Sequence, residues 1–506
     1  MRAGGGRRRR APKDGGRRTG KANALTTTGS NPPRNGAGLT VVPERTRAAP
    51  EGPSSLWLLF LATWGVLALA TLILIRLGID WEYMLFLVAP LTLAGCAWKP
   101  IFGLTLMAAL VPLSGGLGVG GQFSPEQGMG ILFGLGTLIH FLLTRKHLRL
   151  FNTMTLTLFG LNLLAIASVL WAMYPQYALV MVRTPIQMLV YVVLIVSVVR
   201  KRDDLLWPLR IYVAACVLAF LGAAVFGLRT EHYRLAFAFG GGAEVNPNTM
   251  GAVFGLGFLT AIYLFVRSRS VAIRFLLVTA MALLLVGTME TGGRKAVFFL
   301  GVPLLLPLLT GGMMFRRPRL VIGILFGLIL LAVTVYVAAV MFLPALTVWR
   351  MTNPQYAVDS FIRRLGFIEE AYDYVSAHPL GAGWACFRTR SGLVVHNDLF
   401  YLFSNLGVPG ALLFLGFAGS ILYGILRMPR NADKWLAASI ALYQFLLGLG
   451  GAWWFGKQYW LFFSVAWLLA FFWRQPSAGL VGRLSPHGEA GAVSLPAPAG
   501  PAGGPR

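Results

Sequence analysis

The sequence predicts an all-α protein that crosses a membrane many times, and two observations carry this prediction. The 506 residues are 56% hydrophobic and only 12% charged, with a mean hydropathy of +0.68. A soluble domain carries about 25% charged residues, so most of this chain has a lipid-facing composition. Apolar runs long enough to cross about 30 Å of hydrocarbon also recur along most of its length.

These runs predict about fourteen transmembrane helices. They lie near residues 56–76, 83–98, 101–114, 128–144, 153–172, 182–199, 205–227, 248–266, 272–290, 295–312, 319–343, 399–426, 435–454 and 458–473. The second and third runs are short and contain or adjoin Pro. Residues 83–114 therefore fit either two full spans or one re-entrant pair.

The formal charge of +26 does not indicate a nucleic-acid partner, because much of it lies in the first fifty residues and the rest in short clusters between apolar runs. Residues 1–54 form a Gly/Pro/Arg-rich arm that can bury little surface and is predicted to be disordered. The arm is expected to set orientation and contact anionic lipid. The apolar run after it lacks a convincing cleavage site and is expected to remain as the first span.

Basic clusters predict the orientation, because short cytoplasmic loops carry an excess of Lys and Arg. With the N-terminus inside, every strongly basic cluster falls on the cytoplasmic side, and both termini are cytoplasmic. The predicted regions are the arm (1–54), about eleven spans (55–343), a large periplasmic loop (344–398), about three spans (399–474) and a disordered tail (475–506). Loops as long as 344–398 are usually functional.

The large loop is predicted to contain an amphipathic helix. Apolar residues recur at helical spacing before His378 and Pro379 end the pattern, namely Phe361, Leu365, Ile368, Ala371, Tyr372 and Val375. Arg363, Arg364, Glu369, Glu370 and Asp373 are expected on or near the other face. Such a helix either rests on the membrane surface or caps the bundle.

Three predicted outer segments carry Arg234, Arg294 and His396 beside apolar runs. An Arg at a helix end can simply extend to the headgroups, but a cation at a helix N-terminus opposes the macrodipole unless an anion is also present. Guanidinium and backbone N–H groups there favour a phosphate. His396 is either a structural hydrogen-bonding residue or a base with an ordinary pKa of about 6.5.

Neighbouring residues have both structural and functional interpretations. Asn397 or Asp398 can cap the helix after His396, and Asn246-Pro247-Asn248 has the pattern of a helix start more than of a substrate contact. The chain has Cys only at positions 96, 216 and 386, without zinc or disulfide spacing. No nucleotide motif or metal-binding Asp pair is visible, so we expect no metal and no cofactor.

Four segments together resemble the O-antigen ligase and polymerase superfamily of bacterial inner-membrane glycosyltransferases. They are RLAFAFGGGAEVNPNTMG, TGGRKAV, RRLGFIEEAYDYVSAHPLGAGWACF and VVHNDLFYLFSNLGVPGALL, and they cover roughly Arg234 to Phe414. The last two are the more specific, because they place His-Pro-Leu-Gly-x-Gly about a dozen residues before His-Asn. Earlier spans match only in number and hydropathy.

The resemblance implies transfer of a glycan from an undecaprenyl diphosphate carrier on the periplasmic face of the inner membrane. The acceptor is lipid A core in ligases, a carrier-linked repeat unit in polymerases, and a protein Ser or Thr in a further branch; the sequence does not decide among them. Catalytic roles carry over to Arg234, Arg294 and His396. Substrate contacts are expected from Arg363, Arg364, Asn397, Asn248 and Lys295.

Chemical reasoning suits this assignment, because a sugar diphosphate is an activated donor whose departure needs positive charge. A single displacement inverts the anomeric centre and needs a base for the acceptor hydroxyl; Asp398, Glu369 and Glu370 are alternatives to His396. Two departures from the family pattern are the Gly-Gly before Arg294, where Ser-Arg is common, and the acidic Asp398. A multi-span transporter or flippase of lipid-linked or anionic substrates is the competing class, since Pro303, Pro307 and Pro409 could mark broken helices.

Overall fold

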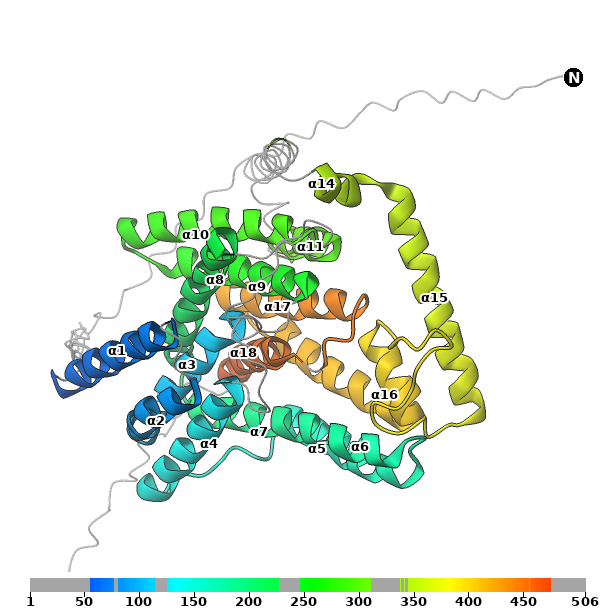
Figure 1. Cartoon of the computed structure of the whole chain (residues 1–506), viewed down its shortest axis with the longest axis horizontal. Helices are drawn as coiled ribbons and strands as arrows, with labels where there is room; N and C mark the ends of the chain where they lie inside the picture. Colours follow the sequence, from blue (N-terminus) through cyan, green and yellow to red (C-terminus); the bar gives the residue numbers. More distant parts are fainter. Residues whose placement is uncertain are drawn as a thin grey trace, which may run out of the picture. The chain divides into compact units, whose positions relative to one another are not determined.

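The computed structural model describes residues 55–76, 81–113, 125–226, 246–310, 337, 341, 345–454 and 456–474. The chain divides into two compact units, Met1–Leu58 and Leu59–Arg506, and the account below concerns the second. Every regular element of the described residues is helical (Figure 1). The predicted arm (1–54), the predicted tail (475–506) and most of the predicted span 319–343 lie outside these residues.

The first eight α-helices lead up to the centre of the bundle. They are α1 (Ser55–Arg76), α2 (Trp81–Trp98), α3 (Pro100–Leu113), α4 (Pro125–Thr144), α5 (Thr153–Ala167), α6 (Pro175–Met181), α7 (Arg183–Val198) and α8 (Leu206–Phe226). The later helices are α9 (Pro247–Arg267), α10 (Val271–Glu290), α11 (Arg294–Thr310), α14 (Ala345–Thr352), α15 (Pro354–Ala377), α16 (Asp398–Leu426), α17 (Ala432–Gly448) and α18 (Lys457–Arg474). Two 3-10 turns, Ser168–Trp171 and Arg202–Leu205, extend α5 and precede α8.

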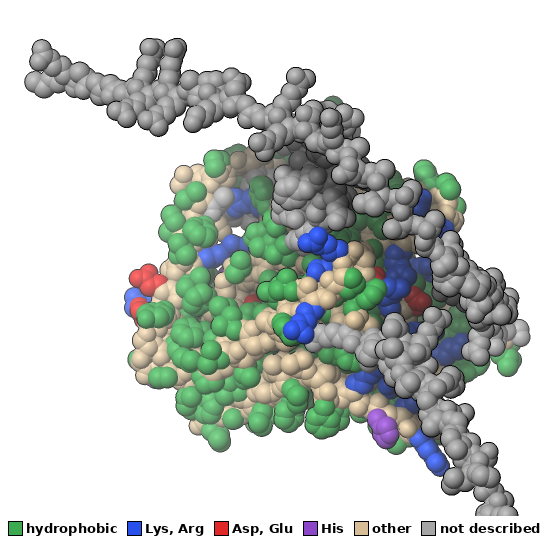
Figure 2. Space-filling view, turned by 180° about the vertical axis from the view of Figure 1, so that it is seen from behind, with side chains coloured by type: hydrophobic (Ala, Val, Ile, Leu, Met, Phe, Trp, Pro, Cys, Tyr) green, Lys and Arg blue, Asp and Glu red, His purple; other side chains and the backbone are tan. Residues whose placement is uncertain are grey.

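Seven helical stretches of the described residues are long and apolar enough to cross a membrane, from Glu126–Thr144 to Asp398–Leu426. Their outer sides are apolar: Leu143 is 78% exposed and Phe275 is 70% exposed, and apolar side chains spread over the face in Figure 2. The chain is therefore an all-α, multi-pass membrane protein, as predicted. The total of about fourteen spans stays a prediction. The described part of the predicted segment 83–114 forms two helices separated at Lys99, of which α3 has only 14 residues.

Helix α9 is the most enclosed of these stretches, with 78% of its apolar window buried against 22% for α10. Its small residues permit this enclosure, because a Cβ at Gly255 would collide with the Tyr443 hydroxyl of α17. Tyr443 in turn donates a hydrogen bond to the Ala296 carbonyl of α11 at 3.1 Å. The contact between α9 and α17 therefore also fixes the first turn of α11.

The bundle has two ends that differ in their side chains. At the end that we name the site end, α9, α11 and α16 begin while α10 and α17 end. At the opposite end lie the clusters predicted to be cytoplasmic. There Arg149 N–H donates to Ser197 Oγ at 2.9 Å, and Arg200 donates to the His147 carbonyl at 3.0 Å.

A buried carboxylate ties four helices or turns together at the opposite end. Asp433 of α17 accepts hydrogen bonds from Arg202 at 2.7 Å, from Arg267 at 3.2 Å and from the Tyr263 hydroxyl at 2.9 Å. Trp473 Nε1 of α18 also donates to it at 3.3 Å. Because one anion satisfies two guanidiniums and two neutral donors, this network acts as a structural crosslink.

The predicted amphipathic helix exists as α15, and it ends before His378 as expected. It has 24 residues and is longer than the four or so turns of the prediction. Its predicted apolar residues lie in one broad sector of the helix, but the rest of the described chain covers only one side of that sector. Ala371 and Val375 are buried, whereas Phe361, Leu365 and Tyr372 are 61%, 48% and 62% exposed.

Candidate functional site

The Gly-rich turn after α15 supports a break in α16. Helix α16 is interrupted at Gly407, whose φ of 66° and ψ of −160° are not helical. The freed backbone groups bond to the turn: Ala382 N–H donates to Ser404 O at 3.0 Å, Gly383 N–H to Asn405 O at 2.9 Å, and Val408 N–H to Pro379 O at 3.1 Å. These bonds remove the cost of buried unpaired backbone.

Glycine is required at this turn for conformation and for space. Gly381 and Gly383 have φ of 76° and 90°, a region that other residues rarely occupy. A Cβ at Gly381 would also lie 2.6 Å from the backbone of Asn405 and Gly407. The His-Pro-Leu-Gly-x-Gly motif therefore holds the interrupted part of α16, residues 404–408, against the loop.

His396 lies between two anchored neighbours. Val395 is 1% exposed and Asn397 is 7% exposed, whereas the His396 side chain reaches the surface. Asn397 caps α16 by accepting from Phe400 N–H at 3.2 Å, and its amide donates to Leu449 O at 3.4 Å. Asn397 thus provides the cap considered from the sequence, and its side chain is engaged with protein groups.

Asp398 points away from His396 into the connection between α17 and α18. It is 2% exposed, and its Oδ1 accepts from Trp453 N–H at 2.7 Å. Its other oxygen lies beside Gly448, where a Cβ would approach it to 2.5 Å. This burial separates the carboxylate from any acceptor at the surface and argues against Asp398 as the base.

The tight turn between α10 and α11 presents two cations at the site end. Gly292 has φ of 58°, and Thr291 Oγ1 accepts from Gly293 N–H at 3.4 Å. Helix α11 then begins at Arg294, whose guanidinium donates to Asn353 O between α14 and α15 at 3.5 Å. The next residue, Lys295, lies over the α17–α18 connection, since a Cβ at Gly450 would be 2.6 Å from its Nζ.

The start of α9 adds Asn248 to the same end. Asn246 caps α9 by accepting from Asn248 N–H at 2.9 Å, and Pro247 occupies the first turn. The Asn248 side chain is exposed, and its Oδ1 would lie 3.7 Å from a Cβ at Gly293. The predicted helix start is confirmed, and Asn248 lies beside the turn that carries Arg294.

Electrostatics connect His396 with the cations of two other helices. Partial burial of the imidazole, and then the positive charges of Lys295 and Arg364, lower the pKa of His396 below its ordinary value. The imidazole is therefore neutral at neutral pH and can accept a proton. The same interactions bring α11, α15 and the start of α16 together at one positively charged place, and Arg294 joins it because its charge acts on Lys295. We name this place the cationic cluster: Arg294, Lys295, Arg364 and His396.

Other residues predicted for the site have different positions. Arg234 lies outside the described residues. On α15, Arg363 is exposed while its neighbour Arg364 is partly buried on the side that faces Lys295. Glu369 is exposed, and Glu370 accepts from Arg390 N–H at 2.7 Å. Of the arginine pair, only Arg364 belongs to the cationic cluster, and Glu370 holds the loop.

Sequence reasoning missed the contribution of the α17–α18 connection, residues 449–456. This segment contacts Lys295 through Gly450, Asn397 through Leu449 and Asp398 through Trp453. The signal was the run Gly448-Leu449-Gly450-Gly451 at the end of a predicted span. Small residues at a helix end permit close approach by other side chains.

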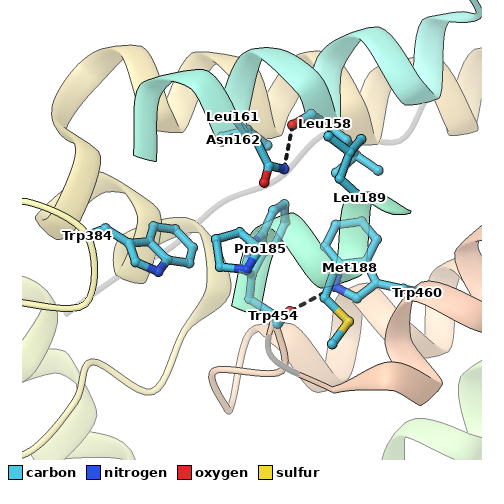
Figure 3. A pocket seen from close by; sticks show the side chains of 9 residues that line it. All are labelled: Leu158, Leu161, Asn162, Pro185, Met188, Leu189, Trp384, Trp454 and Trp460. Carbon is cyan, nitrogen blue, oxygen red and sulfur yellow. Dashed lines mark hydrogen bonds between the residues drawn. The ribbon is translucent and has the colours of Figure 1, made fainter. Parts of the chain in front are cut away.

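An apolar pocket lies next to the Gly-rich turn and is separate from the cationic cluster (Figure 3). It is lined by Leu158, Leu161, Asn162, Pro185, Met188, Leu189, Trp384, Trp454 and Trp460. Two N–H donors of its lining bond to backbone: Asn162 Nδ2 donates to Leu158 O at 2.9 Å and Trp460 Nε1 to Trp454 O at 2.8 Å. The Asn162 Oδ1 atom is buried without a hydrogen-bond partner among the described residues. Trp384 N–H also donates to Ser168 Oγ at 2.9 Å, so the pocket wall anchors the turn to α5.

No protein-family model matches the chain, and no curated protein matches it significantly. Among the described residues, no three His, Cys, Asp or Glu side chains are grouped as metal ligands. Interpretation of the cationic cluster therefore depends on its own chemistry.

Proposed function

We propose that this protein is a glycosyltransferase of surface polysaccharide assembly that takes a glycan from an undecaprenyl diphosphate carrier. The observation that carries the proposal is the cationic cluster, where partial burial and then the charges of Lys295 and Arg364 lower the pKa of His396. A base beside two guanidiniums and an ammonium is the pairing that transfer from a diphosphate requires. One group receives the acceptor proton while the others stabilise the departing anion.

The donor half of the site is the N-terminus of α11. The guanidinium of Arg294 is suited to phosphate oxygens, and Lys295 adds a compact charge that can follow either phosphate. The backbone N–H groups of Arg294 and Ala296 already donate to Gly292 O and Gly293 O, so the side chains carry the proposed contact. The cluster lies where candidate spans end, so a diphosphate could bind there while its isoprenoid chain stays in the bilayer. Arg234 remains the predicted second guanidinium.

The acceptor half is His396. In the proposed step the acceptor oxygen attacks the anomeric carbon, the bond from this carbon to the diphosphate oxygen breaks, and the hydroxyl proton passes to Nε2 or Nδ1 of the imidazole. Undecaprenyl diphosphate leaves with the electron pair. A single displacement of this kind inverts the anomeric configuration and uses no metal.

The acceptor and the location of the site are parts of the same proposal. Lipid A core, a carrier-linked repeat unit and a protein hydroxyl all supply the required nucleophile. We place the protein in a bacterial inner membrane with the site end in the periplasm and both termini in the cytoplasm. Support comes from the basic residues Arg149, Arg200, Arg202 and Arg267 at the opposite end.

A transporter or flippase is the second candidate, and the break at Gly407 favours it, because transporters often bind cargo at interrupted helices. In this chain, however, Ser404 O and Asn405 O beside the break accept bonds from Ala382 and Gly383. The break is therefore closed by protein backbone instead of being open to cargo. This closed break favours an enzyme with a rigid site over a transporter whose helices move around a cargo site.

Deletion of the gene, followed by gel analysis of surface polysaccharides, tests the function. Full-length carrier-linked polymer with bare lipid A core would identify a ligase. Core with a single repeat, or loss of a long exopolysaccharide, would identify a polymerase. Complementation with wild type should restore the glycan, whereas His396→Ala at equal membrane abundance should not. If neither glycan changed, the transporter proposal would replace this one.

His378→Ala is the matched control for that complementation. His378 is an exposed imidazole of the same loop, but it stacks on Tyr374 with ring centroids 4.5 Å apart. It has no part in the proposed chemistry, so this variant should restore the glycan. Failure of both variants would indicate that the loop does not tolerate substitution. The turnover of a lipid-linked donor by the purified proteins would then be measured, and the proposal requires a defect that is specific to His396→Ala.

A further inference from the structure

Helix α15 has two apolar faces, and the structure accounts for only one of them. Phe367, Ala371 and Val375 are at most 6% exposed, and Ala371 packs in a cluster with Ala172, Ala178 and Cys386. The second face is left largely uncovered by the part of the chain that the structure describes. It comprises Val358, Phe361, Ile362, Leu365 and Tyr372, which are 48–62% exposed.

The spacing of the uncovered residues is that of a helix surface. Positions 358, 361, 362 and 365 follow the i, i+3, i+4, i+7 pattern, and Tyr372 continues the same stripe two turns later. Arg364 lies in the same sector of the helix as the buried Ala371 and Val375, where its charge acts on Lys295 and His396. One helix thus presents a cation to the bundle and an apolar stripe away from it.

The ends of α15 show what covers this stripe. Its first residue follows Asn353, whose carbonyl accepts a hydrogen bond from Arg294. Arg294 in turn lies four residues after the end of the candidate span Val271–Glu290. Its last turns pack on Ala172 and Ala178, at the junction of the candidate spans Thr153–Trp171 and Pro175–Val198. Both ends are held where spans end, so the helix, roughly 36 Å long, runs along the membrane boundary.

Aromatic side chains at both ends of the helix also indicate that it lies at the membrane boundary. Trp349 of α14 is 51% exposed, and Tyr174 and Tyr177 beside the docked end are 56% and 42% exposed. Trp and Tyr are enriched where headgroups meet acyl chains. A lipid boundary explains these exposed rings and the stripe together.

We propose that α15 is an interfacial helix whose stripe, Val358, Phe361, Ile362, Leu365 and Tyr372, inserts into the lipid boundary of the membrane that the bundle spans. Four carboxylates and two guanidiniums give the helix a net charge of −2. Insertion therefore rests on apolar burial instead of attraction to anionic headgroups. The lipid surface holds the helix, and the helix in turn holds Arg364 at the level of Lys295.

Site-specific fluorescence in nanodiscs tests this proposal, because the three native cysteines are buried. Phe361→Cys and Leu365→Cys place an NBD label on the stripe. Asp359→Cys is the matched control, since Asp359 is an exposed polar residue of the same helix segment. We expect the two stripe labels to be blue-shifted and quenched several-fold more by doxyl-labelled lipid than the control. The control label should be quenched mainly by aqueous iodide.

Lipid composition and stoichiometry separate the other outcomes. The blue shift should be equal in phosphatidylcholine and phosphatidylglycerol discs, because charge does not drive insertion. Iodide quenching of the stripe labels equal to that of the control would overturn the proposal. A blue shift that resists doxyl lipid and appears only with two proteins per disc would overturn it in favour of a second copy. The wild-type protein measures background labelling.

Discussion

The two ends of the bundle hold their arginines in opposite ways. At the opposite end, Asp433 is 3% exposed at its side chain and accepts from Arg202 at 2.7 Å and Arg267 at 3.2 Å. At the site end, Lys295 and Arg364 lie near each other and near His396, and both oppose its protonation. Two guanidiniums share one buried carboxylate at the opposite end, whereas several positive side chains lie near a histidine at the site end.

This difference distinguishes structural cations from cations suited to a ligand. A guanidinium paired with a buried carboxylate gains stability only as long as both partners stay. Cations that lower the pKa of a neighbouring histidine add little to the stability of the fold, because like charges repel one another. A bound anion would reduce this repulsion. Substitutions at the two ends should therefore change different measured quantities.

The largest expected effect is loss of transfer after His396→Ala. Removal of a general base costs on the order of 10²- to 10⁴-fold in turnover, and Arg294→Ala should lose activity in the same range. Membrane abundance should remain at the wild-type level in both. Turnover of a lipid-linked donor by purified protein measures the effect; reduced abundance with normal activity per molecule would contradict both assignments.

Asp433→Ala should give the opposite result, a loss of stability with activity per folded molecule retained. It leaves the guanidiniums of Arg202 and Arg267 without their buried anion, which costs about 3 kcal/mol. The control is Asp203→Ala, because Asp203 contacts Arg267 at 3.5 Å but its side chain is 64% exposed, so a change below about 1 kcal/mol is expected. Thermal unfolding in detergent measures both; equal shifts would remove the contrast between the ends.

The neighbouring residues Arg363 and Arg364 of α15 test which side chains belong to the cationic cluster. Arg364→Ala should raise the KM for a lipid-linked donor roughly 10-fold, since a charged hydrogen bond contributes about 1.5–3 kcal/mol and part of this is lost to solvent. Arg363→Ala, at the exposed neighbour, should leave the KM within about 2-fold. Steady-state kinetics distinguish the two, and equal effects would show that the helix does not present one face to the donor.

The helical bundle and several residues of the site were predictable from the sequence. Basic loops and apolar runs predicted the helical bundle, and the motif residues Arg294, Lys295 and His396 were selected as site residues. The role of Asn397 as a cap followed from its position before an apolar run. These features depend on local spacing, which a sequence displays directly.

Features set by distant contacts were not predictable. Nothing around Asp433 announces that Arg202 and Arg267 converge on it, because their loops are more than 160 residues away along the chain. The sequence did not separate the covered face of α15 from the uncovered one, because periodicity identifies apolar residues but not the neighbours that cover them. Gly450 looked like an ordinary helix end, and its contact with Lys295 depends on how α11 and α17 pack.

Gly450→Ala tests the position of the Lys295 ammonium without changing Lys295. The added Cβ would lie 2.6 Å from Nζ, and the flexible side chain can move, so folding should be little affected. Displacement of the charge should lower turnover a few-fold. Gly416→Ala in α16 is the control, because nothing lies within 4 Å of its Cβ position. Equal turnover of the two variants would remove Lys295 from the donor site.

The smallest and most specific effect is a shift in pH dependence. Transfer requires neutral His396, so the rate should fall as pH decreases through its pKa, which burial and the charges of Lys295 and Arg364 hold below the ordinary value of about 6.5. Wild-type protein should therefore keep its activity into mildly acidic solution. Lys295→Met removes one of these charges, raises the pKa, and should move the acid limb of the rate profile to higher pH.

The direction of that shift separates two roles of Lys295. If the ammonium only binds the donor, Lys295→Met lowers the rate at every pH and leaves the midpoint of the acid limb unchanged. If it also faces His396, the midpoint rises while the plateau falls. Arg363→Met removes an exposed charge from α15 and should leave the midpoint in place. A midpoint that moved down, or moved equally in both variants, would mean that a group other than His396 controls the acid limb.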